Sequence, residues 1–542
     1  LNRVSATSRL LVKEKPMSGR RYLIFSDLHL CDIEDHADGW KRYKSSRYVF
    51  DPQFSEIVDD FVQDGDGYEL TLILNGDILD FDLITSVPDP APFSVTRRER
   101  KNGLFATEEK SIYRLEQILD AHPVFVDTLT RFVGRGHRLV YVMGNHDMDV
   151  FFSGVQQRFV GFMRSRADEL EVEIDAAKII FESWFYYVPG EIYVEHGQQY
   201  DYYSSFRFVL RPIVTIDGEE RLAIPMGNLA NRQLMSQMGY FNPHAGDFLM
   251  NFVSYMMHWL KFYAFSRRSL LFNWFFGSLY VLLHLLRTKE KYRRPANYDD
   301  LLAEKARTYG LTLDQVRSIE RLQRPPITDF VFRILREFWL DRMLVAGLMV
   351  VGTIALALLS IPLWIKLMVP LTAFPLMFVL YESIASGSTV SGEAKALPRY
   401  AHELAKWLPV QVVAFGHTHT PQLVPLARNL SFVNSGTWAP MWARGGEELL
   451  PGFRNYIVVT APDEGRVIAQ LDSWQTPAGH PLPLERPQNP LRARSTAHDA
   501  HRLPTPTEDA PGHHDPVQYD VERPAQPGPV HAAATNHGEV VR

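Results

Sequence analysis

Five short polar motifs, each directly after an apolar run, constrain the fold of this 542-residue chain most strongly. The apolar runs are Arg21–Ser26, Leu70–Leu74, Arg138–Met143, Ile192–Glu195 and Val410–Phe415. The motifs that follow them are Asp27-Leu-His29, Gly76-Asp77, Gly144-Asn145-His146-Asp147, His196-Gly197 and Gly416-His417-Thr-His419. Such runs are typical of buried strands, and ligands bind at the carboxyl ends of strands in α/β folds. The motifs therefore predict that polar side chains from distant parts of the chain converge on one site.

Helical stretches lie between the early strands, which predicts an α/β fold. Apolar side chains recur at helical spacing in Pro52–Gln63, where we expect Asp51 to be the N-cap. Thr107–Leu119 and Pro123–Phe132 have similar patterns. With 46% hydrophobic and 22% charged residues, most of the chain can form a core, which excludes a disordered protein.

Charge and cysteine content exclude several functional classes. The net charge of −6 argues against a strongly basic nucleic-acid-binding protein, so we expect no nucleic-acid partner. The single cysteine, Cys31, excludes a disulfide framework and a cysteine-based metal site.

The residue types in the five motifs indicate metal binding. They are carboxylates, imidazoles and an amide, which suit Mn2+, Fe2+/Fe3+ or Zn2+, and they are too many for one ion but enough for two. The pattern Asp-x-His places two ligands on one tight loop, as does His-x-His. Glycine before Asp77, Asn145 and His417 allows the backbone to turn sharply and approach the ions closely.

The five motifs, in this order, resemble those of the calcineurin-like metallophosphoesterases. The resemblance covers about Arg20–Tyr200 and Arg399–Gln470. It implies a β-sandwich of mixed sheets flanked by helices, and hydrolysis of a phosphate ester or pyrophosphate by a hydroxide that bridges two divalent metal ions. A family member that kept the fold and lost catalysis, a metal-stabilised membrane scaffold, is the alternative.

The resemblance also implies a role for each motif residue. The first ion would be held by Asp27, His29, Asp77 and His419, with Asp77 bridging to the second. Asn145, His196 and His417 would complete the second ion's ligands.

The catalytic pair implied by the resemblance is His146 and Asp147. His146 would lie off the metals and protonate or orient the leaving group, and Asp147 would fix the His146 imidazole. Asp80 would serve a metal ligand in the same way.

A long hydrophobic insertion divides the predicted catalytic domain. We expect a flexible lead (1–19), the first part of the domain (20–200), the insertion (201–398), the second part of the domain (399–475) and a disordered tail (476–542). His196 and His417 must meet at one site although 221 positions separate them, so any membrane crossings between them must be even in number.

The simplest arrangement is a transmembrane hairpin over residues 343–381, with Met343–Ile361 and Leu363–Tyr381 as its two helices. Arg333, Arg336 and Arg342 precede it, and Lys366 is the single charge at its far turn, which follows the positive-inside rule. The first 21 residues contain no signal-peptide core. We therefore expect a cell-membrane protein whose catalytic domain faces the cytoplasm; the alternative is a buried hairpin in a soluble protein.

The aromatic stretch Phe248–Leu286 leaves three interpretations open: an interfacial amphipathic layer, a second hairpin or a soluble lid.

A hydrophobic insertion after the second-metal histidine, together with Phe25–Cys31, also resembles the UDP-2,3-diacylglucosamine pyrophosphatases. This distant resemblance implies an insertion that binds acyl chains. An active site held against a bilayer predicts a substrate delivered from the bilayer, namely a lipid-linked phosphate or pyrophosphate. A soluble nucleotide, phosphodiester or phosphoprotein is the alternative.

Two groups of basic residues are candidate substrate contacts. Arg207 and Arg211 would share one face of a helix and could grip a second phosphate. Arg97, Arg98, Arg100 and Lys101 lie on an expected loop between Asp77 and His146.

Overall fold

The structure is a computed structural model that describes residues 19–37, 40–233, 236, 270–288, 293–337, 340–385, 393–442, 449–450 and 452–474. The predicted tail, nearly all of the predicted lead, and the first part of the aromatic stretch, up to residue 269, lie outside the described residues.

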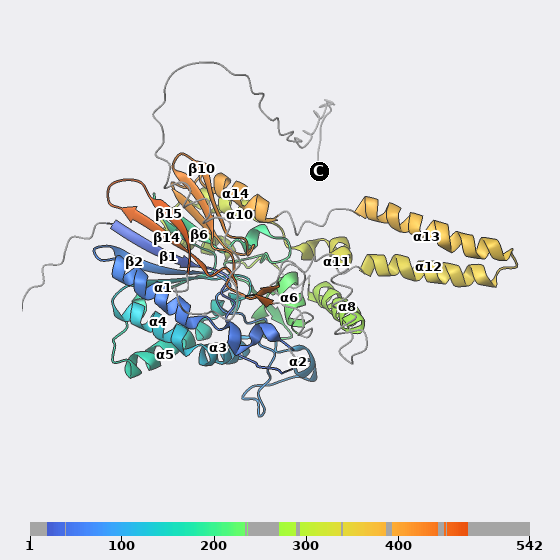
Figure 1. Cartoon of the computed structure of the whole chain (residues 1–542), viewed down its shortest axis with the longest axis horizontal. Helices are drawn as coiled ribbons and strands as arrows, with labels where there is room; N and C mark the ends of the chain where they lie inside the picture. The colour runs from blue at the N-terminus through green and yellow to red at the C-terminus, as the bar shows by residue number, and fades with distance from the viewer. Residues whose placement is uncertain are drawn as a thin grey trace, which may run out of the picture. The chain divides into compact units, whose positions relative to one another are not determined.

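The first sheet has six strands in the order β15-β14-β1-β2-β3-β4 (Figure 1). Their bounds are Gly19–Phe25 (β1), Glu69–Asn75 (β2), Arg138–Val142 (β3), Ile179–Glu182 (β4), Asn455–Pro462 (β14) and Ile468–Ser473 (β15). Strands β1 to β4 run parallel, whereas β14 pairs antiparallel with β1 and with β15. The carboxyl ends of β1, β2 and β3 therefore meet at one edge.

The second sheet has five strands in the order β10-β11-β9-β6-β5. Their bounds are Phe185–Val188 (β5), Ile192–Glu195 (β6), Val412–Phe415 (β9), Gln422–Ala427 (β10) and Leu430–Asn434 (β11). Strand β9 runs parallel to β6 and β11, and the outer strands pair antiparallel. Both sheets are thus mixed, and each contains strands from before and after the insertion.

Alternation along the strands builds an apolar layer between the two sheets. In β1, Tyr22 and Ile24 belong to this layer, whereas Leu23 and Phe25 belong to the core formed with the helices. Val194 of β6 and Ala414 of β9 meet Tyr22 and Ile24 from the second sheet. Side chains of a strand point alternately to its two faces, so this pattern requires both faces of each sheet to be covered.

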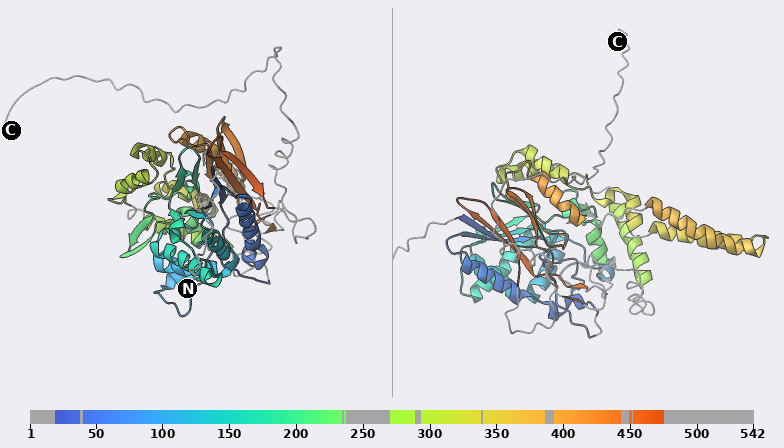
Figure 2. Two further views of the ribbon diagram at one scale, coloured as in Figure 1. Left: turned by 90° about the vertical axis from the view of Figure 1, so that its left-hand side faces the viewer. Right: turned by 45° about the horizontal axis from the view of Figure 1, so that its top comes forward.

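Helices cover the outer faces of both sheets, with the strands between them (Figure 2). The helices beside the first sheet are α1 (Asp51–Asp64), α3 (Glu108–Ala121), α4 (Pro123–Gly134) and α5 (Ser153–Glu169). Those beside the second sheet are α9 (Tyr298–Thr308), α10 (Leu313–Leu322) and α14 (Glu393–Leu404). The predicted helices correspond to α1, α3 and α4.

The expectation that Asp51 caps α1 is wrong. The N-cap is Phe50, Asp51 is the first residue of the helix, and there is no side-chain capping hydrogen bond. The Asp51 carboxylate instead pairs with His122 at 2.8 Å. Its place in the first turn still suits the helix dipole.

The described part of the insertion contains helices and a small β-hairpin. Their bounds are Ile213–Ile216 (β7), Glu219–Leu222 (β8), Met226–Gln233 (α6), Leu270–Thr288 (α8) and Val331–Glu337 (α11). A second two-stranded sheet, β12 (Met441–Trp442) with β13 (Leu449–Leu450), follows β11. One face of α8 packs against α6 through Val281, Leu282 and Leu285, whereas Phe276 on α8 is exposed.

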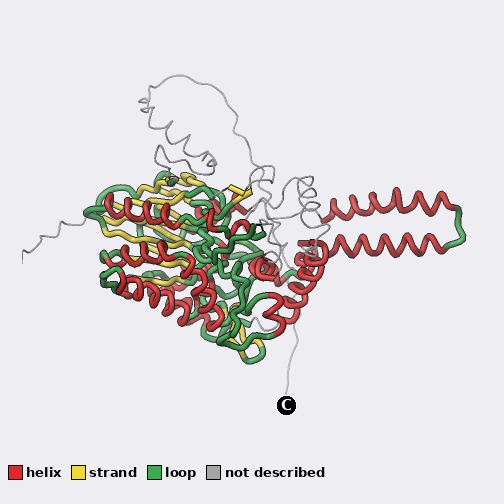
Figure 3. The backbone as a smooth tube through the Cα atoms, turned by 60° about the horizontal axis from the view of Figure 1, so that its bottom comes forward, coloured by secondary structure: helices red, strands yellow, loops and turns green. Residues whose placement is uncertain are grey.

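Two long apolar helices, α12 (Leu340–Leu358) and α13 (Leu363–Ala385), lie side by side and are joined by a short loop (Figure 3). Both are long and apolar enough to cross a membrane, and neither is buried within the chain. At the loop, Lys366 donates a hydrogen bond to the carbonyl of Ala357 at 2.7 Å. At the other end, Tyr381 donates one to Asp341. The two helices correspond to the predicted hairpin.

Candidate metal centre

The five motifs converge at the ends of β1, β2, β3, β6 and β9. The loops after β1 and β2 run side by side, because the amide of Asp27 donates to the carbonyl of Gly76 at 3.1 Å and that of His29 to Asp77 at 2.9 Å. From the far end of the chain, the amide of His417 donates to both carboxylate oxygens of Asp27 at 3.1 Å. The prediction of one convergent site is confirmed for these residues.

Asp27, His29 and His419 form one group that could hold a metal ion. The Nε2 atoms of His29 and His419 lie 3.1 Å apart, and His419 Nε2 lies 3.3 Å from Oδ1 of Asp27. Ligand atoms about 2.0–2.2 Å from a single ion are about 3.0–3.5 Å apart at octahedral to tetrahedral angles. The observed spacing therefore fits a common ion.

Asp77, His196 and His417 form a second group. His196 Nε2 lies 3.0 Å from Asp77 Oδ2, and the rings of His196 and His417 are 5.4 Å apart between centroids. The two groups adjoin through the contact of the His417 amide with Asp27.

The backbone at these positions is unusual. Asp27, His29, Asp77, His417 and His419 all have φ between 51° and 67°, in the left-handed region that residues with a Cβ rarely adopt. Nine described non-glycine residues have positive φ, and these five are candidate metal ligands. Strain of this kind persists only where surrounding contacts impose it, and it concentrates at functional sites.

Glycines before three ligands create the space that the centre needs. A Cβ on Gly144 would lie 2.3 Å from Oδ1 of Asp77, and one on Gly416 would lie 2.6 Å from Oδ2 of Asp27. A Cβ on Gly76 would lie 2.5 Å from the His196 ring. Each glycine thus admits a candidate ligand from another strand.

Outer hydrogen bonds orient two of the candidate imidazoles, those of His29 and His196. Asp80 lies 3.0 Å from Nδ1 of His29, which confirms the expectation that Asp80 serves a candidate ligand. The carbonyl of Asn75 accepts from Nδ1 of His196 at 3.0 Å, so Nε2, 3.0 Å from Asp77, is the ring nitrogen that a neutral His196 would offer to an ion. Such partners fix the tautomer and direction of metal-binding histidines.

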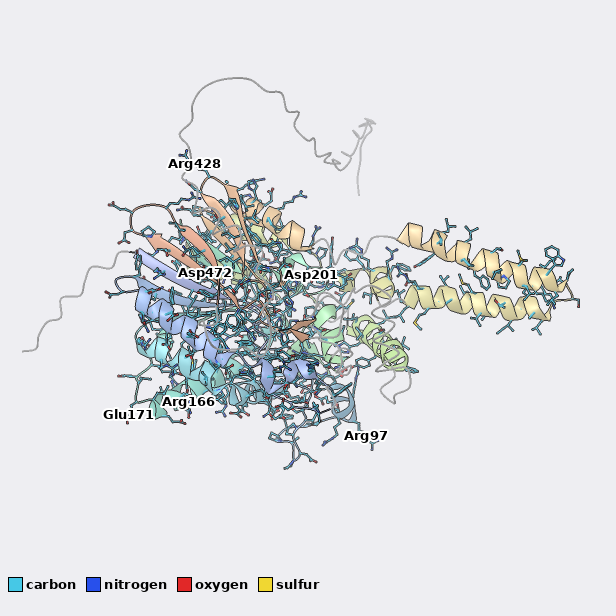
Figure 4. All side chains as sticks on the ribbon, viewed as in Figure 1. Arg97, Arg166, Glu171, Asp201, Arg428 and Asp472 are labelled. Atoms are coloured by element: carbon cyan, nitrogen blue, oxygen red, sulfur yellow. The ribbon has the colours of Figure 1, made fainter. Side chains whose placement is uncertain are left out.

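Asp201 orients a third candidate imidazole, that of His417. Its Oδ2 lies 3.0 Å from Nε2 of His417. Figure 4 shows Asp201 in the middle of the chain's folded part, well apart from Arg97.

The basic run expected on a loop forms the short helix α2 (Arg97–Asn102), which begins with a capping box of Thr96 and Glu99.

His146 is buried beside the first group, with its ring 5.0 Å from that of His29. Its Nδ1 lies 3.0 Å from Asp82 and 3.5 Å from Asp80. The expected contact of Asp147 with His146 therefore needs correction, because Asp82 and Asp80 occupy that position.

Asp147 instead ties the ends of β2 and β3 together. Its carboxylate accepts hydrogen bonds from the amides of Gly144 and Ile78 and from the Tyr141 hydroxyl, at 2.6–2.8 Å. Burial, together with the nearby charge of Asp77, raises the pKa of Asp147 to about 7.

Charge at the centre is balanced by opposite neighbours. Burial opposes ionisation of Asp77, yet the imidazoles of His196 and His146 hold its pKa well below the usual value. Burial also opposes the charged form of His146, but the carboxylates of Asp80, Asp77 and Asp82 raise its pKa well above the usual value. Neighbouring carboxylates and imidazoles thus stabilise one another's charged forms.

The donor set fits divalent metal ions. Oδ1 of Asn145 is buried and has no hydrogen-bond partner among the described residues. Asn145 lies between Gly144 and His146, which both approach Asp77, and the amide of His146 donates to Asp77 at 2.8 Å. An amide oxygen in this position is available to an ion.

Of the two arginines predicted to contact substrate, Arg207 lies in a turn and Arg211 in the irregular segment before β7, so they do not share a helix face. Arg207 pairs with Asp329, and Arg211 lies 3.4 Å from Glu220. Neither has a contact with the candidate metal ligands among the described residues.

A scan of the chain against protein-family models finds no match, and a search among curated proteins finds none either.

Sequence reasoning gave no role to four residues that support the site: Asp82, Asp201, Asn228 and Arg232. Asp82 belongs to an alternating acidic run with Asp80, which was a usable signal. Asn228 and Arg232 lie on α6, and only the folded structure shows that Asn228 contacts Asn145 and that Arg232 contacts Asp82.

Replacing Gly144 with alanine tests this geometry. We expect Gly144→Ala to weaken Mn2+ binding at least tenfold, because its Cβ would displace Asp77. Gly161→Ala on α5 is the matched control, since nothing lies within 4 Å of its added Cβ. Calorimetric titration with Mn2+ measures both; equal affinity in the two variants would contradict the arrangement.

Proposed function

We propose that this protein is a metallophosphoesterase of the calcineurin-like type that uses two divalent metal ions. Its reaction would be hydrolysis of a phosphate ester or pyrophosphate. The observation that carries the proposal is the convergence of two His/Asp groups from four strand ends, with five of these candidate ligands in left-handed backbone.

The ligand assignment follows the order of the motifs. Asp27, His29 and His419 would hold the first ion, and His196, His417 and Asn145 the second, with Asp77 shared. Bound there, such ions supply Lewis acidity toward a phosphoryl oxygen and acidify a water molecule. Mn2+, Fe2+/Fe3+ and Zn2+ all accept this mixture of nitrogen and oxygen ligands.

His146 would act as the proton donor to the leaving group. Its Nδ1 faces Asp82 and Asp80, which hold the ring and favour its protonated form. Nε2 is then the atom that would carry a proton toward the substrate. General-acid catalysis by a positioned imidazole contributes about 10²–10⁴-fold to the rate.

Helices α12 and α13 would anchor the enzyme in the cell membrane with its site on the cytoplasmic side. The proposal is supported by their length, their apolar character and their exposure. Because His196 and His417 lie together, the chain between them must cross an even number of times, which a hairpin satisfies.

A site held beside a bilayer favours a lipid-linked phosphate as the substrate. A soluble nucleotide, phosphodiester or phosphoprotein would require the hairpin to be only an anchor. A non-catalytic scaffold would use the metal centre for stability alone, and it would bind Mn2+ without hydrolysing any phosphoester or pyrophosphate.

Replacing His146 with alanine tests its role. We expect His146→Ala to retain both ions and to lower turnover of an ester with a poor leaving group by about 10²–10⁴-fold. Turnover of a p-nitrophenyl ester should fall much less, because p-nitrophenolate leaves without a proton. His137→Ala, directly before β3, is the control; loss of metal in His146→Ala would show that His146 is a ligand.

Replacing residues 340–385 with a short Gly/Ser linker tests the membrane proposal. We expect the variant to leave the membrane fraction and to lose turnover of lipid-linked phosphates, while hydrolysis of a small chromogenic phosphodiester continues. An unrelated transmembrane hairpin in the same position is the control and should restore membrane attachment. Equal loss of both activities would count against a substrate supplied by the bilayer.

A further inference from the structure

Helix α6 joins the candidate metal centre to the apolar part of the insertion. Asn228 and Arg232 lie four residues apart and therefore share one face of the helix. Both side chains are buried and contact residues of the metal centre. Met226 and Leu229 instead pack in the apolar cluster with α8 and α11.

Asn228 holds the amide and backbone of Asn145. Its Nδ2 donates to the carbonyl of Asn145 at 3.0 Å, and its Oδ1 accepts from Nδ2 of Asn145 at 3.3 Å. Since Nδ2 of Asn145 is used in this way, Oδ1 is the atom of that amide that remains for an ion. Nδ2 of Asn228 also donates to Asp82 at 2.7 Å.

Arg232 holds the carboxylate that faces His146. Its Nε donates to Oδ1 of Asp82, whose Oδ2 lies 3.0 Å from Nδ1 of His146. Its Nη2 donates to Asp149 at 2.6 Å, which fixes the guanidinium from the other side. Because two buried carboxylates hold the planar guanidinium of Arg232, it has a single orientation, and its hydrogen bond fixes the orientation of Asp82 as well.

We propose that α6 is a positioning element of the metal centre, in which Asn228 aims the Asn145 amide at the second ion and Arg232, through Asp82, aims His146. The insertion then completes the site as well as anchoring the chain. The part of this proposal that concerns Asn228, the Asn228 arm, depends on metal binding alone. The part that concerns Arg232, the Arg232 arm, rests on the proposed function.

The apolar face of α6 suggests why these residues lie on the insertion. Its apolar side chains share a cluster with Val281 and Leu285 of α8 and with Ile334 of α11, and α11 contacts α12. The helix is therefore held between the centre and the elements nearest the apolar hairpin.

Metal titration of the full-length protein in detergent tests the Asn228 arm. We expect Asn228→Ala to bind one Mn2+ about 10–100-fold more weakly and the other with unchanged affinity. Asn231→Ala is the matched control, because it removes the same side chain from another face of α6. Wild-type affinities for both ions in Asn228→Ala would overturn this arm.

Leaving-group dependence tests the Arg232 arm. We expect Arg232→Gln to lower kcat for a poor leaving group at least tenfold with KM and both Mn2+ affinities unchanged, and to affect a p-nitrophenyl ester little. Arg232→Lys keeps the charge and should recover part of the loss. Equal losses with both leaving groups, or none, would overturn it.

The two arms separate this inference from the proposed function. If the wild-type protein binds Mn2+ but hydrolyses no phosphoester or pyrophosphate, the phosphoesterase proposal and the Arg232 arm fail together. The Asn228 arm is still decided by the affinities. Thermal unfolding of each variant shows whether it is folded. If Arg232→Gln is unfolded, Arg232→Lys alone decides the Arg232 arm.

Discussion

The burial of several carboxylates where the two sheets meet is the constraint on which the rest of the structure depends. Asp27, Asp77, Asp80 and Asp82 are all buried there. Ionised carboxylates are costly in such surroundings unless cations or hydrogen bonds compensate them. Imidazoles from the ends of β1, β3, β6 and β9 and the guanidinium of Arg232 supply part of that compensation, and the ligand geometry leaves room for metal ions to supply more. Residues far apart in the chain are therefore held as one electrostatic unit.

The insertion is structurally continuous with this unit. It interrupts the chain between β6 and β9, yet these strands pair directly in the second sheet. Its helix α6 contributes buried polar contacts to Asn145 and Asp82, and its other face belongs to an apolar cluster. Under the proposed function, the completeness of the site would depend on how α6 packs against α8 and α11.

Much of the fold and the convergence of the candidate ligands could be predicted, because continuous apolar runs and the polar residues that follow them are local signals. The runs before Asp27, Asp77 and His196 are strands, and the hairpin lies where charge-free sequence indicated it. The hydrogen bonds that surround the candidate ligands were harder to predict from the sequence. Asp147 follows His146 in sequence but contacts Tyr141 and two backbone amides, because the turn after β3 directs it inward. The roles of Asp201, Asn228 and Arg232 depend on where the insertion folds back, and no local pattern encodes that.

Crystals grown with Mn2+ and measured at the manganese absorption edge would test the central claim most directly. The account predicts two anomalous peaks, one about 2.0–2.3 Å from ligand atoms of Asp27, His29 and His419 and one at the same distance from Asp77, His196 and His417. Asn145 Oδ1 should face the second peak. No peak at these residues, or peaks only at other surfaces of the protein, would contradict it.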